Sequence, residues 1–156
     1  MSKPQHPLEL DRHLPSLIQT LGNKISLHAL REGARPHDLD LRELRVILIL
    51  GAEGRSTIND VADRIAMDRG GTSRAISRLE KRGYIARSDD LRDRRRSLVD
   101  LTDQGVRVHD ELASFALTRE ELLLRNLSES DRVHLNELLR RVVGNVDTML
   151  TSGEAR

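Results

Sequence analysis

The chain has 156 residues, of which 37% are hydrophobic, and a formal net charge of +1; this length suits one domain, or one domain with additional helices for assembly. Its only aromatic residues are Tyr84 and Phe115, and it has no cysteine. This composition excludes an aromatic stacking platform for single-stranded nucleic acid, disulfides, thiol nucleophiles and thiolate metal sites. No apolar run approaches the roughly 20 residues of a membrane span, and the first ten residues lack the apolar core of a secretion signal. We therefore expect a cytoplasmic protein with no membrane partner.

Positive charge is concentrated in the middle of the chain. Residues 69–96 contain ten basic and four acidic residues, a net charge of +6. The rest of the chain carries −5, because the whole sequence has 26 basic and 25 acidic residues. Such polarisation is typical of a nucleic-acid-binding face on an otherwise neutral protein, although a solvated basic surface remains the alternative.

The first half of the chain reads as three helical segments. Apolar residues at helical spacing predict a wide-faced helix over residues 8–33, followed by a loop over 32–38 that contains Gly33 and Pro36. Asp40 and Glu43 form a capping pair for a helix that reaches Gly51, and its run of aliphatic residues predicts a buried, central position. Thr57 opens a short helix with four inward positions: Ile58, Val61, Ala62 and Ile65.

A tight break at 66–68 precedes a second short helix. Asp68 is its predicted N-cap, Ile76 and Leu79 are its predicted buried positions, and Gly83 ends it in the left-handed conformation. The remaining positions are predicted to face outward: Arg69, Gly70, Gly71, Ser73, Arg74, Ser77 and Arg78. Short strands over 84–88 and 97–102 then predict a hairpin whose tip is charged.

The chain ends in two predicted helices. Thr102 caps a long helix that carries Val108, Leu112, Phe115 and Leu122. The capping box of Ser128 and Asp131 opens the last helix, on which apolar residues follow a heptad pattern: Leu135, Leu139, Val142, Val146 and Met149. An isolated helix would leave this stripe in water, so we expect residues 8–33 and 128–150 to form a homodimer. Packing of these stripes within a monomer is the alternative.

Together these elements predict a mainly α fold with a small β-ribbon, a winged helix-turn-helix with N- and C-terminal dimerisation helices. The predicted DNA-binding domain covers 37–101, and the dimerisation region covers 1–36 and 102–156. The second helix of the unit has the right size for a DNA major groove, and the ribbon can lie beside it. Gly70 and Gly71 either let the start of that helix approach a phosphate or are flexible loop residues.

Two motifs, "RLEKRGYIARS" and "DRRRSLVDLTDQG", resemble the multiple antibiotic resistance regulator (MarR) family of bacterial transcription regulators. The resemblance implies a homodimeric repressor that binds a palindromic operator in double-stranded DNA. It places Arg95 at the wing tip in the minor groove, held by Asp93, with three neighbours that contact phosphate or attract DNA: Arg92, Arg94 and Arg96. It also places Ser73 and Arg74 at base edges, and Arg69 and Arg78 at the DNA backbone. Ala66 departs from the family, many members of which have glycine in that turn.

The resemblance further implies a small organic effector, aromatic or anionic, bound between the dimerisation helices and the DNA-binding unit. Four residues are candidates to meet its anionic group: His13, His28, Arg31 and His109. For each of them the alternative is an ordinary exposed polar residue. We expect no metal, no cofactor and no catalytic residues, because no nucleophile elbow, phosphate loop or zinc motif is present. An architectural DNA-binding protein without an effector remains open.

Overall fold

The computed structural model describes residues 8–89 and 97–152. The chain divides into two compact units, residues 1–116 and 117–156. The first unit contains the helix-turn-helix and the sheet, and the second contains the end of helix α5 (Asp103–Leu124) and helix α6 (Glu129–Ser152). Within the described ranges, no helix has both the length and the apolar composition of a membrane span.

The N-terminal helix is shorter than predicted, and the predicted loop after it is helical. Helix α1 runs from Leu14 to His28, and the chain continues as a π-helix η1 (Ala29–Ala34) and a 3-10 helix η2 (Arg35–His37). Gly33 is therefore not a loop residue. A Cβ at this position would lie 2.8 Å from the ring of Phe115, so this glycine makes room for the ring.

Helix α2 (Leu41–Glu53) begins at the predicted cap and ends later than predicted. Asp40 and Glu43 form a capping box, and Gly54 ends the helix with a φ of 75°. Gly51, where the sequence pattern placed the break, is helical instead; a Cβ there would lie 2.0 Å from the imidazole of His109. The absence of a side chain at Gly51 therefore leaves room for the His109 ring of α5.

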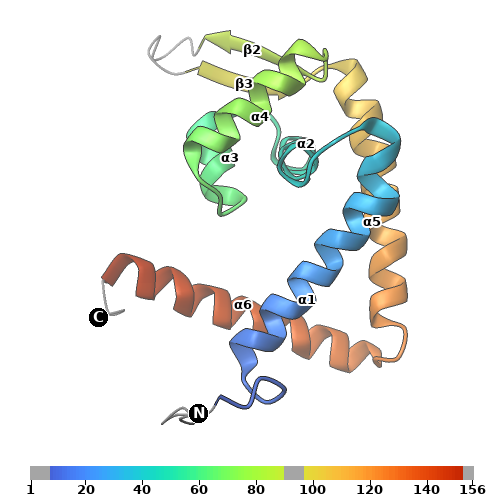
Figure 1. The fold of residues 1–156 in the computed structure, drawn as a ribbon, viewed down its shortest axis with the longest axis vertical. Helices are drawn as coiled ribbons and strands as arrows, with labels where there is room; N and C mark the ends of the chain where they lie inside the picture. Colours follow the sequence, from blue (N-terminus) through green and yellow to red (C-terminus); the bar gives the residue numbers. More distant parts are fainter. Residues whose placement is uncertain (1–7, 90–96, 153–156) are drawn as a thin grey trace, which may run out of the picture. The chain divides into compact units, whose positions relative to one another are not determined.

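The predicted helix-turn-helix is confirmed. Helix α3 (Ile58–Arg64) begins with the Thr57–Asp60 capping box, and helix α4 (Arg69–Lys81) begins at Asp68, whose carboxylate accepts a hydrogen bond of 2.6 Å from the Gly71 N–H. The inward side chains of both helices are buried, apart from a half-buried Ile58. Their crossing lies next to α2, which Figure 1 shows end-on.

Ala66 occupies the turn between α3 and α4 in the left-handed conformation, with a φ of 51°. This conformation costs a residue with a Cβ about 1–2 kcal/mol. We expect Ala66→Gly to raise the free energy of unfolding by about 1 kcal/mol, measured as the midpoint of urea denaturation. Ala52→Gly, at an exposed helical position of α2, should lower it by about 0.5–1 kcal/mol. Equal effects of the two substitutions would contradict a strained turn.

The wing is a three-stranded sheet. Strands β2 (Ile85–Asp89) and β3 (Ser97–Leu101) pair antiparallel, with Ile85 opposite Leu101 and Asp89 opposite Ser97. Strand β1 (Ser56–Thr57) pairs with the other edge of β3 and was not predicted, because two residues leave no periodic signal. Ile85 and Val99 are buried and anchor the sheet on the helices.

The core of the first unit is aliphatic and centres on α2. Val46, Ile47 and Leu50 are fully buried there against residues of α4, including Ile76 and Leu79. Two apolar residues of α5 that the sequence pattern singled out, Val108 and Leu112, are also buried in this core. The core therefore ties α5 to the helix-turn-helix.

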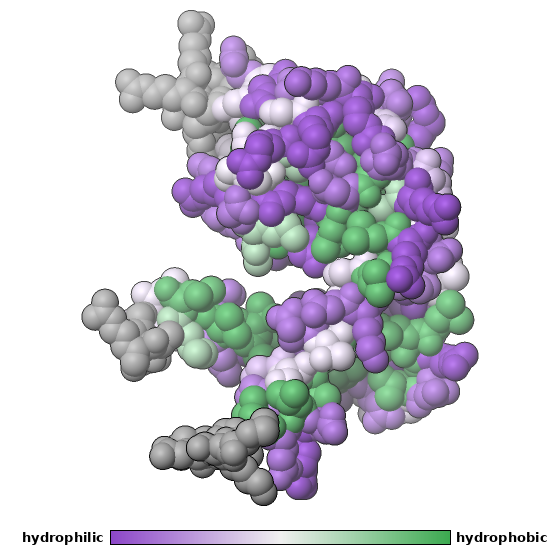
Figure 2. All heavy atoms as spheres, in the orientation of Figure 1, coloured by the Kyte–Doolittle hydropathy of each residue, from purple (hydrophilic) through white to green (hydrophobic). Residues whose placement is uncertain are grey.

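The second unit leaves an apolar surface uncovered. Helix α6 begins at the predicted capping box, where hydrogen bonds from the hydroxyl and the N–H of Ser128 lower the pKa of the Asp131 carboxyl. The heptad residues of α6, here called the α6 stripe, are exposed in the single chain apart from a half-buried Val142: Leu135, Leu139, Val142, Val146 and Met149. Figure 2 shows hydrophobic residues along this helix. Leu122, near the end of α5, is also exposed.

Candidate nucleic-acid interface

Helix α4 presents a face of short and cationic side chains. Arg69, Gly70 and Arg74 are exposed, and Ser73 and Ser77 are half-buried. The helix starts at a strong cap: the pKa of the Asp68 carboxyl is lowered, first by the hydrogen bond from Gly71 N–H and then by Arg42. The charged cap therefore stabilises α4 above the usual pKa of the carboxyl, and its contribution is lost as the pH falls through the lowered pKa.

Gly71 does not face outward, which corrects the sequence prediction. It is buried beneath Arg42 of α2, whose guanidinium donates to the Asp68 carboxylate at 2.8 Å. A Cβ on Gly71 would lie 2.0 Å from Nη1 of Arg42. Gly71 therefore packs against the Arg42 side chain of α2, and Gly70 is the exposed glycine of the first turn.

Arg78 is half exposed, but its guanidinium is bound to two carboxylates of the same chain. Its Nε donates to Oε1 of Glu43 at 2.7 Å, and its Nη2 pairs with the Asp40 carboxylate. The hydrogen bond to Glu43 raises the pKa of Arg78 above its already high ordinary value. Arg82 lies 3.9 Å from the same Glu43 carboxylate. We call these four residues, Asp40, Glu43, Arg78 and Arg82, the arginine–carboxylate cluster.

Other cations of the basic segment are also paired. Arg69 lies 3.6 Å from the carboxylate of Asp63, and Arg87 of β2 lies 3.2 Å from that of Glu80. In the part of residues 69–96 that the structure describes, Arg74 and Lys81 form no ion pair with another described residue. Fewer positive charges are therefore available to an anionic partner than the number of basic residues in 69–96 suggested.

The wing tip lies outside the described residues. Strands β2 and β3 place the ends of the hairpin at Asp89 and Ser97. Five residues predicted to act at the tip fall between them: Arg92, Asp93, Arg94, Arg95 and Arg96. Their roles stay predictions.

The four candidate effector residues have separate local contacts. His13 caps α1 and lies 2.8 Å from the hydroxyl of Ser16, whereas His28 stacks on Phe115 with 5.5 Å between ring centroids. The two histidines flank a helix of 15 residues, so they lie about 22 Å apart. His109 packs over Gly51, and Arg31 is exposed on η1. Among the described residues, no group of three or more histidine or carboxylate side chains could hold a metal ion.

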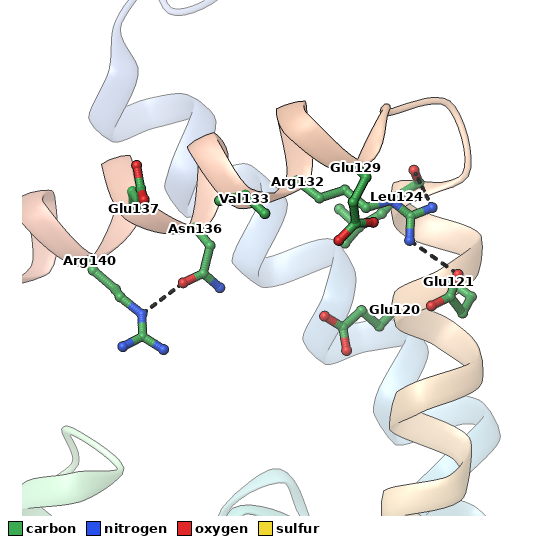
Figure 3. A pocket seen from close by; sticks show the side chains of 9 residues that line it. All are labelled: Glu120, Glu121, Leu124, Glu129, Arg132, Val133, Asn136, Glu137 and Arg140. Carbon is green, nitrogen blue, oxygen red and sulfur yellow. Dashed lines mark hydrogen bonds and ion pairs between the residues drawn. The ribbon is translucent and has the colours of Figure 1, made fainter.

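Two surface hollows were not predicted from the sequence. One of about 290 Å³ lies between α2 and α3 and has an apolar floor, with Arg45 and Arg64 in its lining. The other, of about 560 Å³, lies where α5 meets α6. Figure 3 shows Arg132 at its edge, bound to the Glu121 carboxylate at 3.2 Å and to the Leu124 carbonyl at 3.1 Å. None of the four candidate effector residues lines either hollow.

Comparisons with known proteins agree with this geometry. A family model described as MarR family matches residues 37–96, which include the helix-turn-helix and strand β2 and end directly before β3. The transcriptional regulator SarZ of Staphylococcus haemolyticus is 25% identical over 111 residues, covering 71% of this chain and 74% of the relative.

Solved structures extend the likeness to nearly the whole chain. A MarR/EmrR family regulator from Acinetobacter is 27% identical with a TM-score of 0.83, covering 91% of this chain and all of that one. The PcaV regulator of Streptomyces coelicolor, solved in complex with its natural ligand, is 27% identical with a TM-score of 0.74, covering 90% and 98%. Residues 37–96 therefore match the model of the MarR family of transcriptional regulators, and nearly the whole chain has the fold of the solved regulators named above.

Proposed function

We propose that the protein is a ligand-responsive repressor that binds a palindromic operator as a homodimer and is released or modulated by a small organic effector. The observation that carries the DNA-binding part is the outward face of α4, where exposed Arg74 lies beside half-buried Ser73 and Ser77. The arginine-rich segment between β2 and β3 adds the second contact. Arg74 and Ser73 read base edges in the major groove, and Arg95 enters the minor groove.

The homodimer is supported by the apolar surfaces at both ends of the chain. On α1, Leu14, Leu17 and Leu21 are each about half exposed, and the α6 stripe is largely uncovered. Exposed apolar residues aligned over several helical turns are typical of assembly surfaces. Residues 1–36 and 102–156 act as the dimerisation region, and 37–101 act as the DNA-binding domain. A two-fold dimer presents its recognition helices about 34–36 Å apart, one turn of DNA.

The effector is supported by likeness to PcaV, whose structure holds its natural ligand. His28 and His109 are the candidates best placed to sense it, because both pack at the junction of α5 with η1 and α2. A ligand that favours one spacing of the recognition helices shifts the dimer population away from the DNA-binding spacing. A gel shift on the operator that responds to aromatic carboxylic acids would distinguish this regulator from an architectural DNA-binding protein.

We expect Arg95→Ala to weaken operator binding by about 1–3 kcal/mol, because one minor-groove guanidinium is lost. Fluorescence anisotropy with a labelled duplex from the region upstream of the protein's own gene measures this change. Arg125→Ala is the matched control, since it removes the same charge from the turn between α5 and α6, outside 37–101. Unchanged affinity of the Arg95 variant at physiological salt would refute the wing assignment.

Repression itself is tested with a reporter gene placed behind the same upstream region. Deleting the gene for the protein should raise reporter expression, and Arg95→Ala should reproduce part of that rise. Lower expression after deletion would identify an activator.

A further inference from the structure

A buried carboxylate links the recognition helix to the helix behind it. Glu43 is 4% exposed although it lies in the first turn of α2. Its Oε2 accepts the Asp40 N–H at 2.9 Å, which closes the capping box. Its Oε1 accepts Nε of Arg78 from α4 at 2.7 Å. One side chain therefore completes the start of α2 and binds the outward-facing part of α4.

The same region holds α4 through a second arginine. Arg82, the C-cap of α4, donates to the carbonyls of His37 and Asp38, at 2.8 Å for Asp38. Its guanidinium lies 5.0 Å from the centroid of the Tyr84 ring, within the range of a cation–π contact. Both arginines at the C-terminal part of α4 are thus bound to the segment that leads into α2.

We propose that Glu43 is a positioning residue for operator recognition, which fixes the orientation of α4 through Arg78 and Arg82 and, together with Asp40, neutralises the charge of both guanidinium groups. The inference rests on the proposed operator binding and changes the role of Arg78, which family likeness placed at the DNA backbone. Arg78 acts on the DNA through the placement of Arg74 and Ser73.

The charges of the arginine–carboxylate cluster support this role. Two carboxylates and two guanidinium groups leave the cluster neutral, so it adds no net attraction for phosphate. The Arg78 guanidinium is oriented by two charge-assisted hydrogen bonds, one of them to a buried carboxylate, and its charge is already neutralised by these partners. Arg74, one turn earlier on α4, is exposed and forms no ion pair with another described residue.

The first experiment compares the wild-type protein and Glu43→Gln on two duplexes, the operator and a shuffled sequence of the same length. The glutamine can still accept the Asp40 N–H, so the cap of α2 is kept while the charge that binds both arginines is lost. We expect the ratio of the two affinities to fall at least tenfold, with affinity for the shuffled duplex unchanged or higher. If Glu43 only repelled DNA, both affinities would rise by the same factor, and the proposal would be overturned.

The second experiment uses Arg78→Gln and remains informative if Glu43→Gln does not fold, because the Arg78 side chain is 49% exposed. Each phosphate contact contributes about 0.9 to the slope of log affinity against log salt concentration. Arg78→Gln should leave this slope unchanged while the affinity ratio falls about tenfold. Arg74→Gln, at a position proposed to read a base edge, is the control and should also lower the affinity ratio. A loss of about 0.9 from the slope in Arg78→Gln would identify a phosphate contact and refute the proposal.

The combined variant Glu43→Gln/Arg78→Gln completes the test. If the two residues act as one unit, its affinity ratio should fall no further than that of either single variant. An affinity ratio of the combined variant that falls by the product of the two single-variant factors would contradict the proposal. A wild-type protein that did not distinguish the two duplexes would instead refute the proposed operator binding, so the two failures are distinguishable.

Discussion

Replacing Gly105 with alanine is expected to lower the free energy of unfolding by about 3 kcal/mol. Gly105 is buried in the first turn of α5, and a Cβ there would lie 2.0 Å from the carbonyl oxygen of Tyr84. That carbonyl accepts the Thr102 N–H at 3.0 Å, which joins the start of β2 to the end of β3. The atom in the way of the added Cβ belongs to the backbone and cannot rotate aside. The wing and α5 would therefore have to move apart to remove the overlap.

Urea denaturation of the variant measures this effect, and Gly144→Ala serves as the matched control. Gly144 lies within α6 and has no atom within 4 Å of its added Cβ, so alanine there should stabilise the protein by about 0.5–1 kcal/mol. Opposite signs for the two glycines are the expected outcome. A Gly105→Ala variant as stable as wild type would contradict the close approach of α5 to the wing.

Leu139→Glu is expected to raise the dissociation constant of the homodimer by at least about 100-fold and to weaken operator binding with it. Leu139 lies in the middle of the α6 stripe and is 40% exposed in the single chain. In the proposed dimer its side chain is covered, and a carboxylate in that place would be buried without a partner. Sedimentation velocity measures the dimer, and fluorescence anisotropy measures the operator affinity.

Thr148→Glu is the control for this prediction. Thr148 is exposed on the same helix, and the helical period places it on the face opposite the α6 stripe. The added charge is the same, but we expect dimerisation and operator binding to stay unchanged. Equal loss in both variants would show that charge on α6, rather than coverage of its stripe, controls assembly.

Local sequence signals predicted most of the helix boundaries, because caps act over three or four residues. Asp40, Thr57, Asp68 and Thr102 each accept the expected backbone hydrogen bond, and Gly83 takes the left-handed conformation at the end of α4. The strands of the wing were predicted for the same reason, since their alternation is visible within five residues.

Contacts between distant residues explain the errors. Gly33, Gly51 and Gly71 were interpreted as loop or outward positions, but each receives a side chain from another element: Phe115, His109 and Arg42. A glycine that ends a helix and a glycine that accommodates a neighbouring ring have the same local sequence. Strand β1 was not predicted because its two residues are recognisable as a strand only from their pairing with β3.

The sequence predicted where the candidate interface lies, but it did not predict the ion pairs that its side chains form. Length and spacing predicted helix α4 correctly, with Arg74 exposed and Ser73 half-buried on it, whereas their contacts with DNA stay predictions. The pairing of Arg78 with Glu43 joins residues 35 positions apart, and Glu43 gave only the signal of a helix cap. The predicted roles at the wing tip rest on family likeness, because residues 90–96 lie outside the described part of the structure.

The mass of the complex with DNA tests the central claim most directly. Light scattering coupled to size-exclusion chromatography can weigh the protein of 17.7 kDa, alone and with a duplex from the region upstream of its own gene. We predict a dimer in both cases, with two chains on each duplex and weaker binding to a shuffled duplex at physiological salt. A monomer in solution, or a dimer that binds no duplex from that region, would contradict the account.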